Sequence, residues 1–466
     1  MKTSLGMALL VSLDRTSEDP LHVQLERQLR SGVQTGRLAA HTPLPSTRSL
    51  AADLNLSRGV VVEAYEQLIA EGYFQAEAGS GTRVAALHTE ALRSAMAEPA
   101  RPAPRYDFQP GTPDVLSFPR RAWFASLRRA FAGAPADAFL YPNPRGPLVT
   151  RAALAAYLGR SRATVGQADC IVMCSGFLQG VDLVARLLKA RGVRHVAIED
   201  PGFGRLASVF HALEITVHPI PIDAHGLVVE RLLATPATAV FATPVHQFPT
   251  GAGMSAERRT ALLAWAEERD ALIVEDDYDA EYRYDREPLG ALQGMAPNRV
   301  IYIGTGSKIL SPALRLGWLL ASPALADELA ALKLRADGGS SIVDHLALAD
   351  FVNAGELDRH LRRMRQIYRR RRDLMVEALR EHLPELEVGG MRAGLHLMVN
   401  LPGHVDEAAL VARAREQSIA MFAASDYRIR PAPDEPAMVL GYGCAVDSQI
   451  GHGIERLAQL VREGVG

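Results

Sequence analysis

Apolar runs alternate with helical patterns between residues 170 and 308, and this alternation constrains the fold more than any other feature. The apolar runs are CIVMCSG, HVAIEDPGF, ATAVFATPVHQF, ALIVEDDYD and RVIYIGTGSK, with helical patterns such as VDLVARLLKA and ERRTALLAWAEERD between them. Strands that alternate with helices form a mostly parallel sheet. Ligands of such sheets bind at the carboxyl ends of the strands, so we expect the functional side chains directly after these runs.

A Pro-rich segment divides the 466-residue chain. Pro99, Pro102 and Pro104 alternate with Ala and Arg, which favours an extended spacer. We expect a small domain at residues 1–85, a linker at residues 86–106 and a large domain at residues 107–466.

Charge and composition exclude several classes of protein. The chain carries 51 Lys and Arg against 53 Asp and Glu, so no global basic field indicates a nucleic-acid binder. A hydrophobic content of 48% excludes disorder as the main state. Three cysteines without a CxxC pair favour a reducing compartment, which predicts a cytoplasmic protein. Pro236, Pro244 and Pro249 interrupt the longest uncharged stretch, and we expect neither a membrane span nor an export signal.

The small domain is predicted to be a winged helix–turn–helix. Apolar residues at helical spacing follow Pro20, and the stretch LPSTRSLAADLNLSRGVVVEAYEQLIAEGYF predicts two short helices with Ser46 and Ser57 as N-caps. The stretch YFQAEAGSGTRVAAL then alternates around GSG, as in a strand–turn–strand hairpin.

A DNA-reading surface follows from this fold, because the second helix of the pair enters the major groove by its N-terminal turn. The predicted DNA-binding residues are Ser46, Arg48, Ser57, Arg58, Gly81 and Thr82, with Gly79 beside them at the wing tip. Residues 1–88 contain 8 basic and 9 acidic side chains, so a protein-binding winged helix is the alternative.

Lysine is scarce, and only Lys2, Lys189, Lys308 and Lys333 are present. Lys308 lies just beyond the apolar run VIYIG, where a buried amine would have a lowered pKa and attack an aldehyde. Lys189 and Lys333 lie in amphipathic helices and are predicted to be solvated.

Other polar residues follow the remaining strands. The amides after Ser175, at Gly176 and Phe177, could hold a phosphate at a helix start. Asp276 and Tyr278 end another strand; a carboxylate there could pair with a pyridine nitrogen, although a capped turn is the alternative. A lysine, a carboxylate and a phosphate site together are what pyridoxal 5′-phosphate requires, and no metal site is predicted.

The chain resembles a known family in both parts. Residues 21–84 resemble the GntR-type winged helix, through LPSTRSLAADLNLSRGVVVEAYEQLIAEGYFQAEAGSGTRV. Residues 107–466 resemble the type I aminotransferase fold, through motifs that include YPNPRGPLVTRAALAAYL, TPVHQFPTG, VEDDYDAEYRY and GTGSKILSPALRLGW. In this order the two parts resemble the MocR/GabR family of transcriptional regulators, which implies a large domain with a mostly parallel sheet and a smaller C-terminal α+β subdomain.

The resemblance implies a role for each matched residue. Lys308 would form the internal aldimine, Asp276 would pair with the pyridinium nitrogen, and Tyr278 would bind the phenolic oxygen. His246 or Gln247 would approach that oxygen, and Phe203 would stack on the ring. The phosphate would be bound by Gly176, Phe177, Thr305, Ser307 and Arg315, and by Tyr141 of the other subunit of a domain-swapped homodimer.

Three departures from the family pattern affect what the resemblance implies. On the recognition helix Val60 replaces the usual polar Thr, and Glu63 stands at a position that is commonly basic or neutral. We expect Glu63 to point away from phosphate or to restrict the DNA sequences bound. Val439 stands where many aminotransferases have a carboxylate-binding arginine. Arg205 and Arg430 are therefore the predicted effector-binding residues, with Arg428 as a further candidate.

A basic helix remains to be assigned. The stretch GELDRHLRRMRQIYRRRRDLMVEALREHL carries seven arginines between Arg362 and Arg372 beside an apolar stripe. It predicts an amphipathic helix with a solvated basic face, with a second DNA contact as the alternative.

The predicted function is a pyridoxal-phosphate-dependent, DNA-binding regulator that senses a small amine or amino acid through aldimine chemistry at Lys308. The alternative is an active aminotransferase with an accessory winged helix, and weak or half transamination is compatible with both. A third hypothesis is a repressor whose large domain binds no cofactor.

Overall fold

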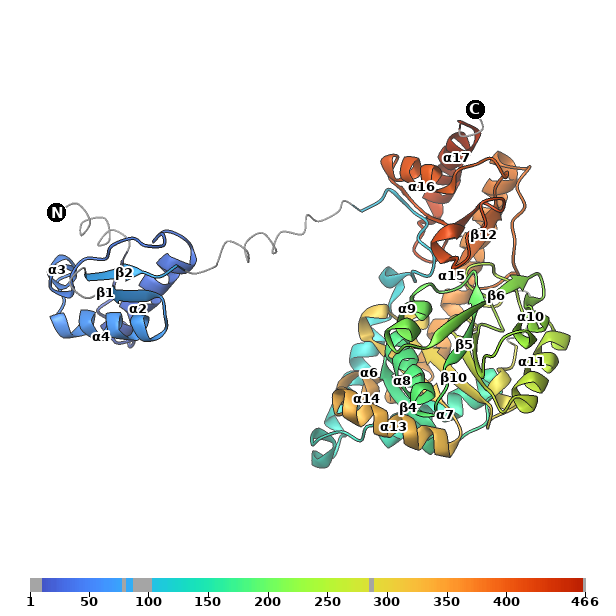
Figure 1. The fold of residues 1–466 in the computed structure, drawn as a ribbon, viewed down its shortest axis with the longest axis horizontal. Helices are drawn as coiled ribbons and strands as arrows, with labels where there is room; N and C mark the ends of the chain where they lie inside the picture. Colours follow the sequence, from blue (N-terminus) through green and yellow to red (C-terminus); the bar gives the residue numbers. More distant parts are fainter. Residues whose placement is uncertain (1–10, 78–80, 87–102, 285–288, 464–466) are drawn as a thin grey trace. The chain divides into compact units, whose positions relative to one another are not determined.

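The chain forms two compact units, Met1–Pro102 and Ala103–Gly466, in a computed structural model that describes residues 11–77, 81–86, 103–284 and 289–463 (Figure 1). Gly79 and most of the expected linker lie outside the described residues. Tyr106, which the sequence places in the linker, lies in strand β3 (Tyr106–Asp107) and pairs with β13 (Ile419–Ala420). The second unit therefore begins at Ala103 rather than at residue 107.

The first unit is a winged helix–turn–helix. It contains α2 (Leu21–Gln34), α3 (Thr47–Asp53) and α4 (Arg58–Ala70), followed by the antiparallel hairpin of β1 (Phe74–Glu77) and β2 (Gly81–Val84). Both predicted caps form, because Ser46 Oγ accepts from the amide of Ser49 and Ser57 Oγ accepts from the amide of Val60. Between the two helices Asn55 has a φ of 52°, a left-handed conformation that asparagine tolerates.

The second unit is built on a large, mostly parallel sheet, as the alternating pattern predicts. Its strand order within the described residues is β4 (Ile171–Ser175), β11 (Leu316–Leu320), β10 (Val300–Thr305), β9 (Leu272–Asp277), β8 (Ala239–Ala242), β5 (His195–Asp200), β6 (Thr216–Asp223) and β7 (Gly226–Leu227). Strands β10, β9, β8, β5 and β6 run parallel. Strand β11 is antiparallel to both of its neighbours, β4 and β10.

Helices cover both faces of this sheet because the side chains along its buried strands point alternately to the two faces. On β4, Val172 and Cys174 pack with α8 (Phe177–Ala190), α9 (Arg205–Ala212) and α13 (Pro323–Asp337). Ile171 and Met173 point the other way, toward α7 (Leu148–Arg162) and α14 (Ile342–Asn353). Helices α10 (Val229–Leu233) and α11 (Ala256–Glu268) cover the other end of that second face. Helix α6 (Arg120–Ala132) packs on α14.

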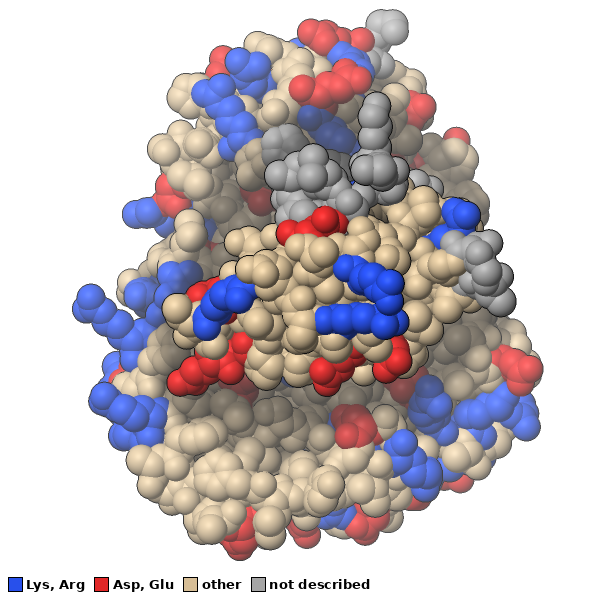
Figure 2. Space-filling model, turned by 90° about the vertical axis from the view of Figure 1, so that its left-hand side faces the viewer, with Lys and Arg blue, Asp and Glu red and all other residues tan. Residues whose placement is uncertain are grey.

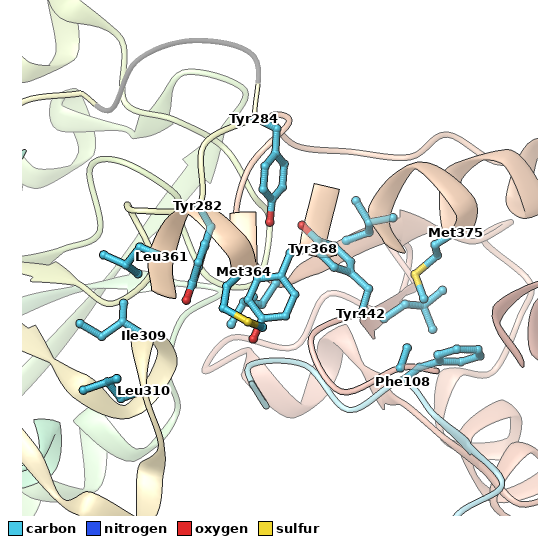
Figure 3. Close-up of a cluster of buried hydrophobic side chains, with 14 of the residues drawn as sticks. Phe108, Tyr282, Tyr284, Ile309, Leu310, Leu361, Met364, Tyr368, Met375 and Tyr442 are labelled. Atoms are coloured by element: carbon cyan, nitrogen blue, oxygen red, sulfur yellow. The ribbon is translucent and has the colours of Figure 1, made fainter. Parts of the chain in front are cut away.

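The C-terminal part, coloured red in Figure 1, forms a smaller α+β subdomain. The long helix α15 (Glu356–His382) leads to an antiparallel sheet of β12 (His396–Asn400), β15 (Ala437–Gly441) and β14 (Phe422–Ala423), with α16 (Glu407–Glu416) and α17 (Asp447–Glu463) beside it. A cluster of buried side chains joins α15 to the large sheet (Figure 3). Ile309 and Leu310, next to Lys308, belong to this cluster, so the core fixes the backbone at that lysine.

The basic helix α15 differs from the sequence prediction. Arg371 donates to Asp114 Oδ2 and Asp447 Oδ1, both at 2.9 Å, and Arg372 is buried. A solvated basic face is therefore wrong for these two arginines, and Arg371 ties α15 to Asp114 and to Asp447 of α17. Arg362, Arg363, Arg369 and Arg370 are exposed as predicted.

A buried ion pair joins α7 to the end of β9. Arg162 Nε lies 2.6 Å from Asp277 Oδ2, and the two side chains are 0% and 2% exposed. Arg162 also donates to the carbonyl of Leu289. Removing one partner of such a pair leaves an uncompensated buried charge, which costs far more than the pair itself contributes.

We expect Arg162→Met to lower the free energy of unfolding by about 3–5 kcal/mol, because Asp277 would stay buried without its partner. Arg160→Met on the same helix is the matched control, since Arg160 makes an exposed pair with Asp358, and its cost should stay within about 1 kcal/mol. Urea unfolding measures both, and equal effects of the two substitutions would contradict the assignment.

Candidate functional site

A cavity of about 250 Å³ lies at the carboxyl ends of the parallel strands, where the sequence predicts the functional side chains. The predicted residues that line it are Phe177, Phe203, Asp276, Tyr278, Thr305, Ser307, Lys308 and Arg315. Gly111, Phe248 and Tyr427 also line it, although none was among the predicted site residues.

Lys308 points into this cavity from α12 (Gly306–Ile309), the short helix that follows β10. Its Nζ donates a hydrogen bond to the carbonyl of Gly111. Burial lowers the pKa of Lys308, although the charges of Asp279 and Asp276 oppose the shift. A lowered pKa raises the fraction of neutral amine, which is the nucleophilic form.

Asp276 faces the same cavity from the end of β9. Its Oδ1 is buried and has no hydrogen-bond partner among the described residues. Burial, together with the nearby charges of Asp277 and Glu199, raises the pKa of Asp276 well above its ordinary value. A buried acceptor without a donor is costly, so this oxygen fits a ligand that brings a donor, such as a protonated ring nitrogen.

The turn from β4 to α8 forms a cradle for an anion. Gly176 caps α8 with a φ of 83°, and a Cβ at this position would lie only 2.7 Å from Arg315 Nη2. The same Nη2 donates to the carbonyl of Ser175 at 2.6 Å, which holds the guanidinium against the turn. The free amides of α8, the guanidinium and the Ser307 hydroxyl together fit a phosphate group.

Aromatic side chains complete the cavity wall. Phe203 packs edge-on against Phe177, with ring centroids 5.8 Å apart. The Tyr278 hydroxyl lies 3.1 Å from His246 Nδ1. Gln247 instead donates to the carbonyl of Pro201 at 2.8 Å, so of the two residues expected near the ring oxygen only His246 adjoins Tyr278.

Tyr141 and the predicted effector-binding arginines do not line the cavity of their own chain. Tyr141 is fully exposed and lines a separate surface groove. Arg205 and Arg430 are exposed and do not line the cavity, and Arg430 contacts Asp200 only through its backbone amide. Arg428, the further candidate, donates to the carbonyl of Ala432.

Lys333 is a residue that the sequence prediction misjudged. It was expected to be solvated, but its side chain is 0% exposed and its Nζ lies 2.5 Å from Asp337 and 2.8 Å from Ser340 Oγ. It also donates to Gln179 Oε1, which accepts the amide of Ser175 at the phosphate cradle. Helical spacing places Lys333 on the buried face of α13, four residues after Leu329 and three after Ala330, so the sequence did contain a signal for its burial.

The first unit presents its predicted DNA-binding residues on its surface. Arg48 and Arg58 are exposed and form no ion pair with the residues that the structure describes, and Gly81 and Thr82 lie at the start of β2. The hydroxyls of Ser46 and Ser57 accept from the helix amides, so their protons remain free to donate. Glu63 lies 3.6 Å from His22 of α2. Basic and acidic side chains are interspersed over the visible face in Figure 2, in keeping with the balanced charge.

Comparisons with known proteins match both units. The family described as "Aminotransferase class I and II" matches residues 111–438, and "Bacterial regulatory proteins, gntR family" matches residues 21–84. The HTH-type transcriptional regulator YhdI of Bacillus subtilis is 33% identical, over 96% of both chains. The rhizopine catabolism regulatory protein MocR of Rhizobium meliloti is 32% identical over 96% of this chain and 95% of its own. The pyridoxine biosynthesis regulator PdxR of Corynebacterium glutamicum is 35% identical over 84% and 85%.

Solved structures resemble the second unit. Kynurenine aminotransferase from Pyrococcus horikoshii has a TM-score of 0.71 and 26% identity, over 82% of this chain and 95% of its own. Aspartate aminotransferase from Thermus thermophilus has a TM-score of 0.67 at 19% identity, over 80% and 94%.

Fold and site therefore define a GntR-type winged helix joined to an aminotransferase-type unit, and that fold implies binding of pyridoxal phosphate. The chain belongs to the MocR/GabR family of transcriptional regulators. Among the described residues, no helix is both long and apolar enough to cross a membrane.

We expect Lys333→Met to lower the free energy of unfolding by about 2–3 kcal/mol, because it removes charged hydrogen bonds beneath the phosphate cradle. Lys189→Met, which removes a partly exposed lysine paired with Glu214, should cost less than about 1 kcal/mol. Thermal and urea unfolding of both variants checks this. If Lys333→Met unfolds with the same free energy as wild type, the buried network contributes nothing to stability.

Proposed function

We propose that this regulator holds pyridoxal phosphate at Lys308 and responds to a small amine or amino acid that reacts there. The observation that carries the proposal is the unpartnered Asp276 Oδ1, which faces the cavity that Lys308 and Arg315 also line. When bound, the cofactor supplies an aldehyde that condenses reversibly with amines, so an effector amine can compete with Lys308 for it.

Each residue of the cavity has a defined task in this proposal. Asp276 holds the ring nitrogen in its protonated state, and Arg315 with the α8 amides binds the phosphate. Phe203 packs against the ring, and Tyr278 donates to the ring oxygen. Lys308 supplies an amine whose pKa burial has lowered, which favours its neutral, nucleophilic form.

Effector binding must change DNA binding for the protein to regulate transcription. An effector shifts a conformational equilibrium only if it binds the two states with different affinity. We propose that occupancy of the cavity alters the spacing of two winged helices on DNA. Each winged helix would contact the DNA through the predicted residues Ser46, Arg48, Ser57, Arg58, Gly81 and Thr82. Such a regulator would act in the cytoplasm, where its three free cysteines stay reduced.

A homodimer is part of this proposal. Exposed apolar side chains, including Phe139, Leu140, Tyr141 and Leu148, cluster around a groove of about 920 Å³ between α6, α7 and α14. Monomeric proteins rarely leave such a patch exposed, so a second copy of this chain is the proposed occupant. Tyr141 would then reach the phosphate of the partner's site, and the family resemblance supports an exchange of winged-helix units between the chains.

An active aminotransferase is the second candidate. The low pKa of Lys308 and the complete cavity favour it, but neither Arg205 nor Arg430 lines the cavity as a carboxylate ligand. Sustained amino-group transfer to a keto acid would support this candidate, whereas a single half-reaction is compatible with sensing.

The deciding experiment is footprinting of DNA upstream of the protein's own gene, first without and then with pyridoxal phosphate, and finally with candidate amines. Protection that changes with the amine in wild-type protein, and not in Lys308→Ala, supports the proposal. Protection that no amine alters would contradict amine sensing. The absence of any protected site would contradict binding to the DNA upstream of the protein's own gene.

We expect Lys308→Ala to abolish the visible absorbance that purified protein acquires with pyridoxal phosphate, because no other lysine in the part of the chain that the structure describes lines the cavity. Lys189→Ala is the control, and it should keep the full band because Lys189 lies on the surface of α8 beside Glu214. A wild-type protein that stays colourless after cofactor addition would contradict the proposed site.

We expect Arg58→Ala to weaken binding to operator DNA about 10-fold at fixed salt, since one base or phosphate contact contributes about 1–3 kcal/mol. The visible band should not change, because Arg58 belongs to the other unit. Arg27→Ala, on α2 and paired with Asp19, serves as the surface control. Equal affinity of wild type and Arg58→Ala would reject α4 as the recognition helix.

A further inference from the structure

A buried polar cluster lies directly behind the cavity wall. His246 Nδ1 is 3.0 Å from Asp279 Oδ2, 3.2 Å from Asp279 Oδ1 and 3.1 Å from the Tyr278 hydroxyl. The side chains of His246 and Asp279 are each 1% exposed. Tyr278 is the member of this group that lines the cavity, so the imidazole and the carboxylate reach the cavity only through the phenol.

Asp279 is a buried carboxyl group whose hydrogen-bond partner is an imidazole. No arginine or lysine among the described residues forms a salt bridge with it, whereas neighbouring Asp277 is paired with Arg162. A buried carboxylate is costly without a charged or hydrogen-bonded partner, so the position of Asp279 depends on His246. The two side chains therefore act as a pair.

The packing around this pair allows very little movement. Gly394 lies against both members, since a Cβ there would be 2.0 Å from His246 Cε1 and 2.6 Å from Asp279 Oδ2. The hydroxyls of Tyr284 and Tyr442 both donate to the carbonyl of Gly394, at 2.5 and 2.8 Å. The glycine, held by two tyrosines, fixes the imidazole at hydrogen-bond distance from Tyr278.

We propose that His246 and Asp279 are positioning residues that together hold the Tyr278 hydroxyl toward the cofactor. Through this hydroxyl they set the pH at which the cofactor-linked nitrogen of Lys308 loses its proton. The inference rests on the proposed cofactor site. It adds the reason why Tyr278 has a fixed orientation. A phenol that donates to the ring oxygen stabilises negative charge there, and this lowers the pH at which the nitrogen is deprotonated.

The other titratable groups around the pair are accounted for. His396 of β12 lies with its ring centroid 5.0 Å from that of His246; burial and His246 lower its pKa well below the ordinary value, so it stays neutral. Its Nε2 donates to the carbonyl of Pro249 at 3.1 Å. Tyr284 and Tyr442 have raised pKa values because of burial, so they too remain neutral. Asp276 and Lys308 line the cavity on the far side of Tyr278.

A metal ion is the competing explanation for this cluster. One ligand atom from each of His246, Asp279 and His396 lies within 4.8 Å of the others. His246 Nδ1 lies 3.0 Å from Asp279 Oδ2 and 3.1 Å from the Tyr278 hydroxyl, however, and both are hydrogen-bond distances. The neutral His396 is already engaged with a carbonyl, which also favours the hydrogen-bonded arrangement.

The test is a double-mutant cycle on the full-length protein loaded with pyridoxal phosphate. The variants are Tyr278→Phe, His246→Asn and the double variant, and the readout is the pH midpoint of the change in the visible band. We expect Tyr278→Phe to raise the midpoint by about one pH unit, since it removes one hydrogen bond to a charged oxygen. His246→Asn should raise it in the same direction, and the double variant should match Tyr278→Phe alone.

The shift of the pH midpoint in the double variant distinguishes a positioning role of His246 from a role in packing alone. A His246→Asn shift that persists in full in the Tyr278→Phe background, or the absence of any shift, would overturn the proposal. The control is Glu281→Gln, which alters a buried carboxylate of the same segment that accepts from Tyr157 at 3.0 Å and should leave the midpoint unchanged.

Two further measurements keep the outcomes distinct. Thermal unfolding of each variant without cofactor shows whether it folds, and His246→Gln replaces His246→Asn if that variant does not. Elemental analysis that finds a stoichiometric metal ion in wild type and none in the His246 variant would overturn the proposal in favour of a metal site. A wild-type protein without a visible band would overturn the proposed function itself, and the inference with it.

Discussion

The alternation of side chains along β9 is the constraint on which the whole site depends. Glu275 and Asp277 point to one side of the strand, where Glu275 accepts the amides of Leu292 and Gln293 and Asp277 pairs with Arg162. Asp276 points to the other side, into the cavity. Burial raises the pKa of Glu275 to about 7, so three adjacent carboxyl groups coexist without three full buried charges. One face of the strand holds the structure together and the other faces the cavity proposed for the cofactor.

Lys308 is held with comparable precision from the opposite wall. Tyr282 donates to the carbonyl of Lys308 at 3.3 Å, and Ile309 and Leu310 are anchored in the core that α15 covers. Long-range contacts of this kind keep the amine in place when the cavity is empty. A preorganised site needs less reorganisation on binding, which favours both affinity and a defined response to an effector.

Much of the fold could be predicted because its signals are local. The apolar runs and the helical patterns fixed the parallel sheet, and Ser46 and Ser57 marked the helix starts before any packing was known. The site residues after the strands also gathered in one cavity, since carboxyl ends of parallel strands share an edge. The antiparallel β11 carried no such signal, because an apolar run looks the same in either direction. Lys333 and Arg372 were misjudged although they lie at helical spacing from buried apolar residues, because their charge alone suggested solvation. Arg371 was misjudged because its partners, Asp114 and Asp447, are distant in the sequence.

By itself, then, the sequence determined the order of the two units, the parallel architecture and the lysine expected in the cavity, since four lysines left a single candidate after a strand. Only the tertiary structure decided which groups face that lysine. It placed His246 and Asp279 behind Tyr278 and kept Arg205 and Arg430 away from the cavity. It also left Asp276 Oδ1 without a hydrogen-bond partner among the residues that the structure describes. These are properties of distance and burial between segments far apart in the chain, and no local pattern of residues contains them.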